Sequence, residues 1–250
     1  MMKIKVLLVA ALAFLMSNLA FTENENIAME YVSVDINDKE SLQRGAKMFM
    51  NYCSGCHSLK YMRYNRMAQD LGLTTFDGQI AEDLLKNNLI FTQANIYDPI
   101  QIAMSPEDAK QWFGMVPPDL SLSARDRGPV WIYNYLKSFY SDPSRPFGAN
   151  NLLMPDVAMP NVLEPLIGKV ILVKDKNSHA NSLLVVKRGE MFEGQFDSAL
   201  RDLVNFLVYV GEPAKLIRYK LGVFVLLFFC IFLIAAYSLK KAYWKQLKLE

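Results

Sequence analysis

Two of the chain's three cysteines and one of its two histidines fall within five consecutive positions, in the run CSGCH. Two thiols three residues apart can add to the two vinyl groups of a haem, and the pattern C-x-x-C-H is typical of this attachment. The histidine that follows can bind the iron as its proximal ligand. The run therefore predicts one c-type haem, bound covalently through Cys53 and Cys56 and ligated by His57.

Two other kinds of site also use paired cysteines. A thioredoxin-type redox pair needs a βαβ context and a low-pKa thiolate, whereas the segment before Cys53 has the apolar periodicity of a helix. A zinc site needs a second pair of ligands, and only Cys230 and His179 remain in the sequence. Because Cys230 falls in an apolar stretch that resembles a membrane span, the haem interpretation is favoured.

A haem that transfers electrons needs a sixth iron ligand, and a methionine thioether in that place raises the potential. Three of the thirteen methionines lie next to or near prolines, which can hold an irregular loop rigid: Met115, Met154 and Met159. His179 is disfavoured, because its Lys, Asn and Ser neighbours are typical of an exposed turn. On the residues alone, the three methionines remain alternatives.

The elements that must position these residues are mainly helical. Apolar residues recur at helical spacing over 39–53, ahead of the motif, and over 197–210. Residues 142–165 carry five of the eleven prolines and are expected to be irregular. Further helices are expected at 80–90, 105–113 and 130–140, and a hairpin at 168–188.

Both ends of the chain carry apolar segments. Lys3 and Lys5 precede the uncharged run 6–15, which is the layout of a secretory signal. Residues 221–239 are apolar on every face and long enough to cross a bilayer. The expected organisation is a signal peptide (1–20), a periplasmic mono-haem domain (21–214), a transmembrane helix (215–240) and a cytoplasmic tail (241–250).

The exported part of the chain is acidic. Residues 22–214 carry 18 Lys and Arg against 24 Asp and Glu. This balance argues against nucleic acid as a partner. It is compatible both with a cationic protein partner that is attracted electrostatically and with the ordinary charge of a soluble surface.

The helix before the motif shows a second pattern. Gly45 precedes Phe49 by four residues, and Phe49 precedes Cys53 by four. This spacing resembles the first helix of the cytochrome c fold, in which the glycine lets a C-terminal helix approach closely. The segment 197–210, with Phe206, resembles that second helix.

Four segments carry a more specific resemblance: CHSLKYMRY, MVPPDLSLSARDRG, MPDVAMPNVLE and VYVGEPAK, the last followed by a single anchor. In this order they resemble the cytochrome c1 family in its compact proteobacterial form. That family provides the haem subunit of the cytochrome bc1 complex (ubiquinol:cytochrome c reductase). The resemblance implies a mainly α fold, with a cytochrome c-like haem domain, irregular insertions and one C-terminal transmembrane helix in the bacterial inner membrane.

The resemblance also implies roles for individual residues. Met159 matches the axial methionine, with Met154 as the second candidate, and Pro118 matches a residue that lines the haem. Arg125 and Arg127 match arginines near the haem propionates, where a guanidinium offers paired donors to a carboxylate.

Two aromatic residues complete the implied site, and one feature of the family is missing. Tyr64 and Trp131 are expected to pack on or near the porphyrin.

Many family members carry a cysteine pair that braces the domain. Here the only spare thiol is Cys230, so the loop 142–165 is expected to be held by packing and by haem contacts.

The function implied by the resemblance is that of an electron relay. An electron would arrive from a Rieske iron–sulfur protein and leave to a soluble cytochrome c, while quinol oxidation would occur in cytochrome b. The chain would contact membrane lipid and would be an enzyme only as part of the complex. The alternatives are a tethered cytochrome that serves an oxidase directly, and a haem enzyme with an open sixth position.

Overall fold

The computed structural model describes residues 29–174 and 181–247. The expected signal peptide (1–20) and His179 lie outside these residues. The described helices are α2 (Lys39–Tyr52), α3 (Tyr64–Leu71), α4 (Glu82–Asn88), α5 (Pro106–Phe113), α6 (Ser123–Asp126), α7 (Pro129–Lys137), α8 (Glu164–Ile167), α9 (Glu193–Gly211) and α10 (Lys215–Leu247). The described strands are β1 (Leu59–Arg63), β2 (Pro99–Ile100), β3 (Phe139–Ser141), β4 (Ala149–Asn151), β5 (Gly168–Lys174) and β6 (Asn181–Arg188). The expected helices at 39–53, 80–90, 105–113 and 197–210 are confirmed, as is the hairpin.

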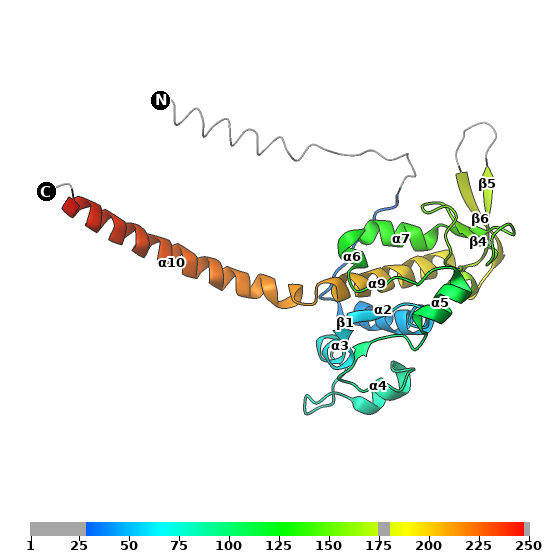
Figure 1. Ribbon diagram of the computed structural model, residues 1–250, viewed down its shortest axis with the longest axis horizontal. Helices are drawn as coiled ribbons and strands as arrows, with labels where there is room; N and C mark the ends of the chain where they lie inside the picture. Colours follow the sequence, from blue (N-terminus) through cyan, green and yellow to red (C-terminus); the bar gives the residue numbers. More distant parts are fainter. Residues whose placement is uncertain (1–28, 175–180, 248–250) are drawn as a thin grey trace, which may run out of the picture.

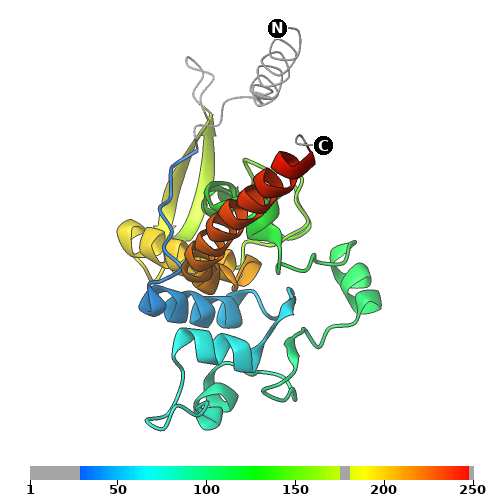
Figure 2. The same ribbon diagram turned by 90° about the vertical axis from the view of Figure 1, so that its left-hand side faces the viewer.

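The helices are stacked in the order α7, α9, α2, α3 and α4, with α9 at the centre of the core (Figure 1, Figure 2). At the crossing of α2 and α9, a Cβ added to Gly45 would lie 2.1 Å from the carbonyl oxygen of Asp202. Only a glycine permits so close an approach of two backbones. The rings of Phe49 and Phe206 pack beside this point, with centroids 5.9 Å apart. The expected pairing of these two helices is therefore confirmed.

The core lies between these helices and is apolar. Most of its fully buried side chains come from α2, β1, α3 and α9, with others from α4 and β2, and they pack in one cluster. The largest of them are Phe49, Phe206, Tyr209, Leu42, Leu59, Met62, Met67 and Leu71. Burial of this cluster is the main force that fixes the end of α2, where the C-x-x-C-H motif lies.

The described part of the chain contains three two-stranded antiparallel sheets beside the helices. β5 and β6 form the expected hairpin, with Ile171 opposite Leu184. The expected helix at 130–140 is wrong at its end, because α7 stops at Lys137 and the chain continues as β3. There Phe139 pairs with Asn151 of β4. Both residues are buried, and the strand pairing gives their backbone N–H and C=O groups hydrogen-bond partners.

The C-terminal helix α10 extends away from the rest of the protein (Figure 1). Residues 221–245 form a helix long and apolar enough to cross a membrane, and none of the most apolar part is buried inside the protein. A helix that exposes Phe, Leu and Ile on all sides is stable in lipid and not in water. Among residues 29–174 and 181–247 there is therefore one candidate membrane span, and it lies in the C-terminal helix.

Candidate functional site

The C-x-x-C-H motif begins where α2 ends. The side chain of Asp38 accepts a hydrogen bond from the Ser41 amide and caps the start of this helix. At its end, the carbonyl of Cys53 accepts hydrogen bonds from the amides of Cys56 (3.0 Å) and His57 (2.8 Å). The motif is therefore one tight turn, from which both thiols and the imidazole project. Both cysteines are free thiols, Cys53 buried and Cys56 half-buried.

His57 is held in one tautomer. Its Nδ1 lies 2.8 Å from the carbonyl oxygen of Pro118, and a carbonyl can only accept, so Nδ1 carries the proton. The other ring nitrogen, Nε2, is left with a free lone pair. Burial lowers the pKa of His57, although the hydrogen bond to Pro118 acts in the opposite direction. The imidazole is thus neutral and prepared to bind a metal through Nε2.

The loop that provides this carbonyl is fixed against the motif by three further hydrogen bonds. The Leu120 amide donates to the Ser58 carbonyl (2.9 Å), and the Lys60 amide donates to Asp119 Oδ2 (2.9 Å). The Tyr61 amide donates to Oγ of Ser121, a residue with no exposed surface. Pro118 acts here through its backbone carbonyl, which holds the His57 ring.

The two thiols are neutral at ordinary pH. Burial raises the pKa of Cys53 to about 12, and the neighbouring Cys56 adds to this effect. Burial also raises the pKa of Cys56. A redox pair of the thioredoxin type needs the opposite shift, because its reactive form is a thiolate. Within residues 29–174 and 181–247, no three His, Cys, Asp or Glu side chains cluster as a metal site.

Met159 differs from the other two candidate methionines. Its side chain is half-buried, and its Sδ accepts a hydrogen bond from the Tyr135 hydroxyl at 3.4 Å. Met154 and Met115 are 46% and 54% exposed. The structure therefore favours Met159 as the methionine that is held in place.

The loop that carries Met159 is held by two buried asparagines, which the sequence analysis missed. Asn151 Oδ1 accepts hydrogen bonds from the amides of Leu153 (2.9 Å) and Met154 (3.1 Å), while its Nδ2 donates to the Tyr135 carbonyl (2.7 Å). Asn150 Oδ1 accepts from the Asp156 amide at 2.9 Å. These hydrogen bonds brace the loop in addition to the packing and cofactor contacts expected from the sequence.

Two of the implied residues, Trp131 and Arg127, are connected to Met159 through Tyr135. Trp131 stacks on Tyr135, with ring centroids 5.0 Å apart and planes 8° apart. The guanidinium of Arg127 lies over the Trp131 ring at 5.1 Å from the centroid, and its side chain remains exposed. The residues Arg127, Trp131, Tyr135 and Phe139 follow one another at intervals of four. This spacing could have identified Tyr135 from the sequence.

The remaining implied residues lie elsewhere. Tyr64 is buried and lines a cavity of about 350 Å³ together with Ser54 and Gly55 of the motif. Arg125 is exposed, and the stem of its side chain lies against Gly211 at the end of α9. The structure thus places Cys53, Cys56, His57 and Pro118 in one group and Arg127, Trp131, Tyr135 and Met159 in another.

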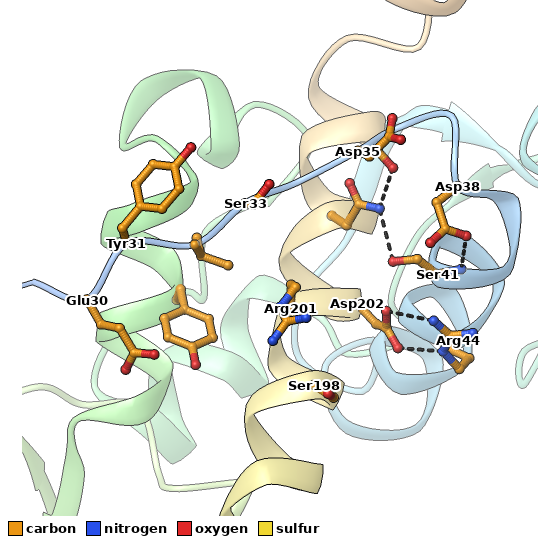
Figure 3. Close-up of a pocket in the computed structure, with 13 residues that line it drawn as sticks. Glu30, Tyr31, Ser33, Asp35, Asp38, Ser41, Arg44, Ser198, Arg201 and Asp202 are labelled. Atoms are coloured by element: carbon orange, nitrogen blue, oxygen red, sulfur yellow. Dashed lines mark hydrogen bonds and ion pairs between the residues drawn. The ribbon is translucent and has the colours of Figure 1, made fainter.

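A larger cavity, of about 710 Å³, contains none of the predicted site residues. It lies between residues 30–38, α2 and α9 (Figure 3). Within it the guanidinium of Arg44 makes two hydrogen bonds to the carboxylate of Asp202, at 2.6 and 3.1 Å. This pair joins α2 to α9 next to Gly45 and has a structural role.

The donor set of the first group fits a covalently bound haem. Two neutral thiols lie on one turn with a histidine whose Nε2 is free, and its proton is fixed on the opposite nitrogen by a backbone carbonyl. A haem is the cofactor that uses this combination.

Comparison with known proteins agrees with this geometry. The sequence model of the Cytochrome C1 family matches residues 31–247. The chain is 48% identical to cytochrome c1 of Allochromatium vinosum over 87% of this chain and 89% of that protein. It is 41% identical to the ammonia monooxygenase gamma subunit of Nitrosomonas europaea over 99% of this chain and 100% of that protein.

A solved structure of a hyperthermophilic respiratory Complex III is similar with a TM-score of 0.48 at 17% identity, covering 98% of both chains. The family match extends over the haem motif, both helices of the crossing and the apolar C-terminal helix. The chain therefore belongs to the cytochrome c1 family.

Proposed function

We propose that this chain is the electron-transfer subunit of a cytochrome bc1 complex, in which it carries one haem c. The observation that carries the proposal is the hydrogen bond from His57 Nδ1 to the Pro118 carbonyl, which leaves Nε2 free for iron. Membership of the cytochrome c1 family supports the same conclusion. It does not favour the alternatives of a cytochrome that serves an oxidase directly or a haem enzyme with an open sixth position.

Four residues of the chain would bind the haem. The thiols of Cys53 and Cys56 would each add to one vinyl group, and His57 would bind the iron. Met159 would be the sixth ligand, so that a haem bound by both ligands joins the two groups of residues. A haem held by these residues would supply one-electron transfer.

Several implied residues would shape the surroundings of the haem. Arg127 is the better candidate for a propionate partner, because its exposed guanidinium already lies over Trp131. Arg125, on the neighbouring turn, would be the second. Trp131 and Tyr64 would exclude water from the porphyrin faces, which favours a relay over chemistry with small molecules.

The partners and location follow from the family. The electron would come from the Rieske iron–sulfur protein and leave to a soluble cytochrome c, with cytochrome b in the same complex. The chain would be exported by its signal peptide (1–20). It would then remain anchored in the bacterial inner membrane by the helix that begins at Lys215, with the haem domain in the periplasm and residues 241–250 in the cytoplasm.

Covalent attachment is tested by mass and by haem content. The mass of the mature native chain should include one haem, and Cys53→Ala or Cys56→Ala should lose one of the two thioether bonds. Cys230→Ala is the matched control, because this exposed thiol lies in α10. A native chain without added haem, or a Cys230→Ala variant that loses haem, would contradict the proposal.

The sixth ligand and the complex are tested separately. Met159→Leu should sharply lower the midpoint potential, and the reduced variant should then bind carbon monoxide at the vacated position. Met154→Leu should leave both properties unchanged. Purification of the native chain should also yield cytochrome b and Rieske subunits. A chain that instead purifies with an oxidase alone would support the alternative.

A further inference from the structure

Tyr135 is a half-buried tyrosine whose hydroxyl lies beside the proposed iron ligand. Its oxygen is 3.4 Å from Met159 Sδ, to which the hydroxyl donates a hydrogen bond. A tyrosine hydroxyl keeps its proton at physiological pH, because the ordinary pKa of this group is about 10. A buried tyrosine hydroxyl normally has a partner, and here that partner is sulfur.

The tyrosine ring has little freedom to move. It stacks on Trp131 with planes 8° apart and meets Phe139 edge-on, with centroids 5.2 Å apart and planes at 72°. Its backbone carbonyl accepts a hydrogen bond from Asn151 Nδ2 at 2.7 Å. The same asparagine holds the start of the loop that carries Met159. Both the hydroxyl donor and the sulfur acceptor are therefore fixed relative to each other.

We propose that Tyr135 is a positioning residue that orients Met159 and tunes the redox potential of the site. This inference rests on the proposed function, in which Met159 is the sixth ligand. A thioether sulfur has two lone pairs, and the hydroxyl engages one of them. The other lone pair remains free for the iron, so the tyrosine determines which side of the sulfur can bind.

The hydroxyl also acts electrostatically. The positive end of its O–H dipole points at the sulfur and disfavours the extra positive charge of the oxidised site. Hydrogen bonds to ligand atoms are an established means by which proteins adjust the potential of iron centres. Loss of this hydroxyl should therefore stabilise the oxidised form and lower the midpoint potential.

The test is Tyr135→Phe in the full chain within its complex. The variant keeps the ring and therefore both aromatic contacts, so it removes only the donor. The ratio of oxidised to reduced protein at fixed ambient potential should rise several-fold, where a tenfold change corresponds to about 59 mV for one electron. The weak charge-transfer absorption from methionine sulfur to ferric iron should also shift or lose intensity.

Tyr133→Phe is the matched control. Tyr133 lies on the same helix and is buried, but its ring packs near Lys137 Nζ at 5.5 Å and its hydroxyl faces Asp197. This control should lower thermal stability and leave the potential and the charge-transfer band unchanged. If Tyr133→Phe and Tyr135→Phe changed the potential equally, the effect would be general loosening and the inference would be wrong.

The variant Met159→Leu distinguishes a failure of this inference from a failure of the proposed function. If the charge-transfer band persists in Met159→Leu, the ligand assignment itself fails and the inference fails with it. If Met159→Leu abolishes the band while Tyr135→Phe changes neither band nor potential, the ligand assignment stands and only the role of Tyr135 is overturned.

Discussion

Replacing Gly45 with alanine should weaken the crossing of α2 and α9. A Cβ at this position would lie 2.1 Å from the Asp202 carbonyl oxygen and 2.7 Å from Phe206 Cβ. Ordinary contacts begin near 3.4 Å, so the helices must separate by roughly 1 Å at this point. Neither contacting atom is the far end of a flexible side chain, so the backbone of one helix has to move.

The steric loss of stability in Gly45→Ala is partly offset by the higher helix propensity of alanine. Overpacking a tight contact costs about 1–3 kcal/mol, and contact with the backbone places Gly45→Ala at the upper end of this range. Alanine recovers about 1 kcal/mol, because it favours the helix more than glycine does. The net loss in free energy of unfolding should be about 2 kcal/mol, which lowers the Tm of a domain of this size by about 4–8 °C.

Thermal unfolding of the full chain in detergent, followed by far-UV circular dichroism, measures this loss. Gly194→Ala is the matched control, because Gly194 lies in the first turn of α9 and a Cβ there would meet nothing within 4 Å. Its Tm should stay the same or rise slightly. A Gly45→Ala protein as stable as the native chain, or an equal loss in Gly194→Ala, would refute the steric reasoning.

Three further predictions concern the core and the loop. Tyr209→Phe should cost about 1.5 kcal/mol in unfolding free energy, because the Tyr209 hydroxyl donates to Asp70 Oδ2 at 2.8 Å; an unchanged Tm would contradict this. Burial, with Asp70 adding to it, raises the pKa of Tyr209 above its ordinary value of 10.0. The folded state therefore binds this proton more tightly than the unfolded state does. The free energy of unfolding should be constant below about pH 10 and fall above it. The fall should be less steep in Tyr209→Phe. Asn151→Ala should loosen the loop of Met159 and allow the reduced protein to bind carbon monoxide, whereas unchanged exclusion of carbon monoxide would show that other contacts hold the loop.

The longer helices could be predicted because their apolar faces repeat over several turns. For 39–53 and 197–210 the resemblance to the cytochrome c fold also predicts which faces meet, since in that fold a glycine in the first helix lets the C-terminal helix approach closely. The short strands β1 to β4 could not be found in this way. Each has only two to five residues, and pairing with distant chain, not local periodicity, determines where it forms.

The site was predictable only in part. The spacing of Cys53, Cys56 and His57 indicates haem chemistry without further information. Pro118 acts through its carbonyl oxygen, which every residue type possesses, so residue identity alone cannot reveal it. Asn151 resembles a turn residue in sequence, yet it is fully buried and hydrogen-bonds to the chain on both sides. The role of Asn151 depends on its burial in the folded structure, which cannot be read from a single sequence.

The short connection between α9 and α10 has a consequence for how the protein meets other molecules. Only residues 212–214 separate the two helices, and an ion pair between Arg218 and Glu212 spans the junction. Three residues reach at most about 10 Å even when fully extended, so the domain stays at a nearly constant height above the bilayer. The connection therefore limits how far the domain can move away from the end of α10. Any molecule that meets the domain must approach it close to that end of the helix.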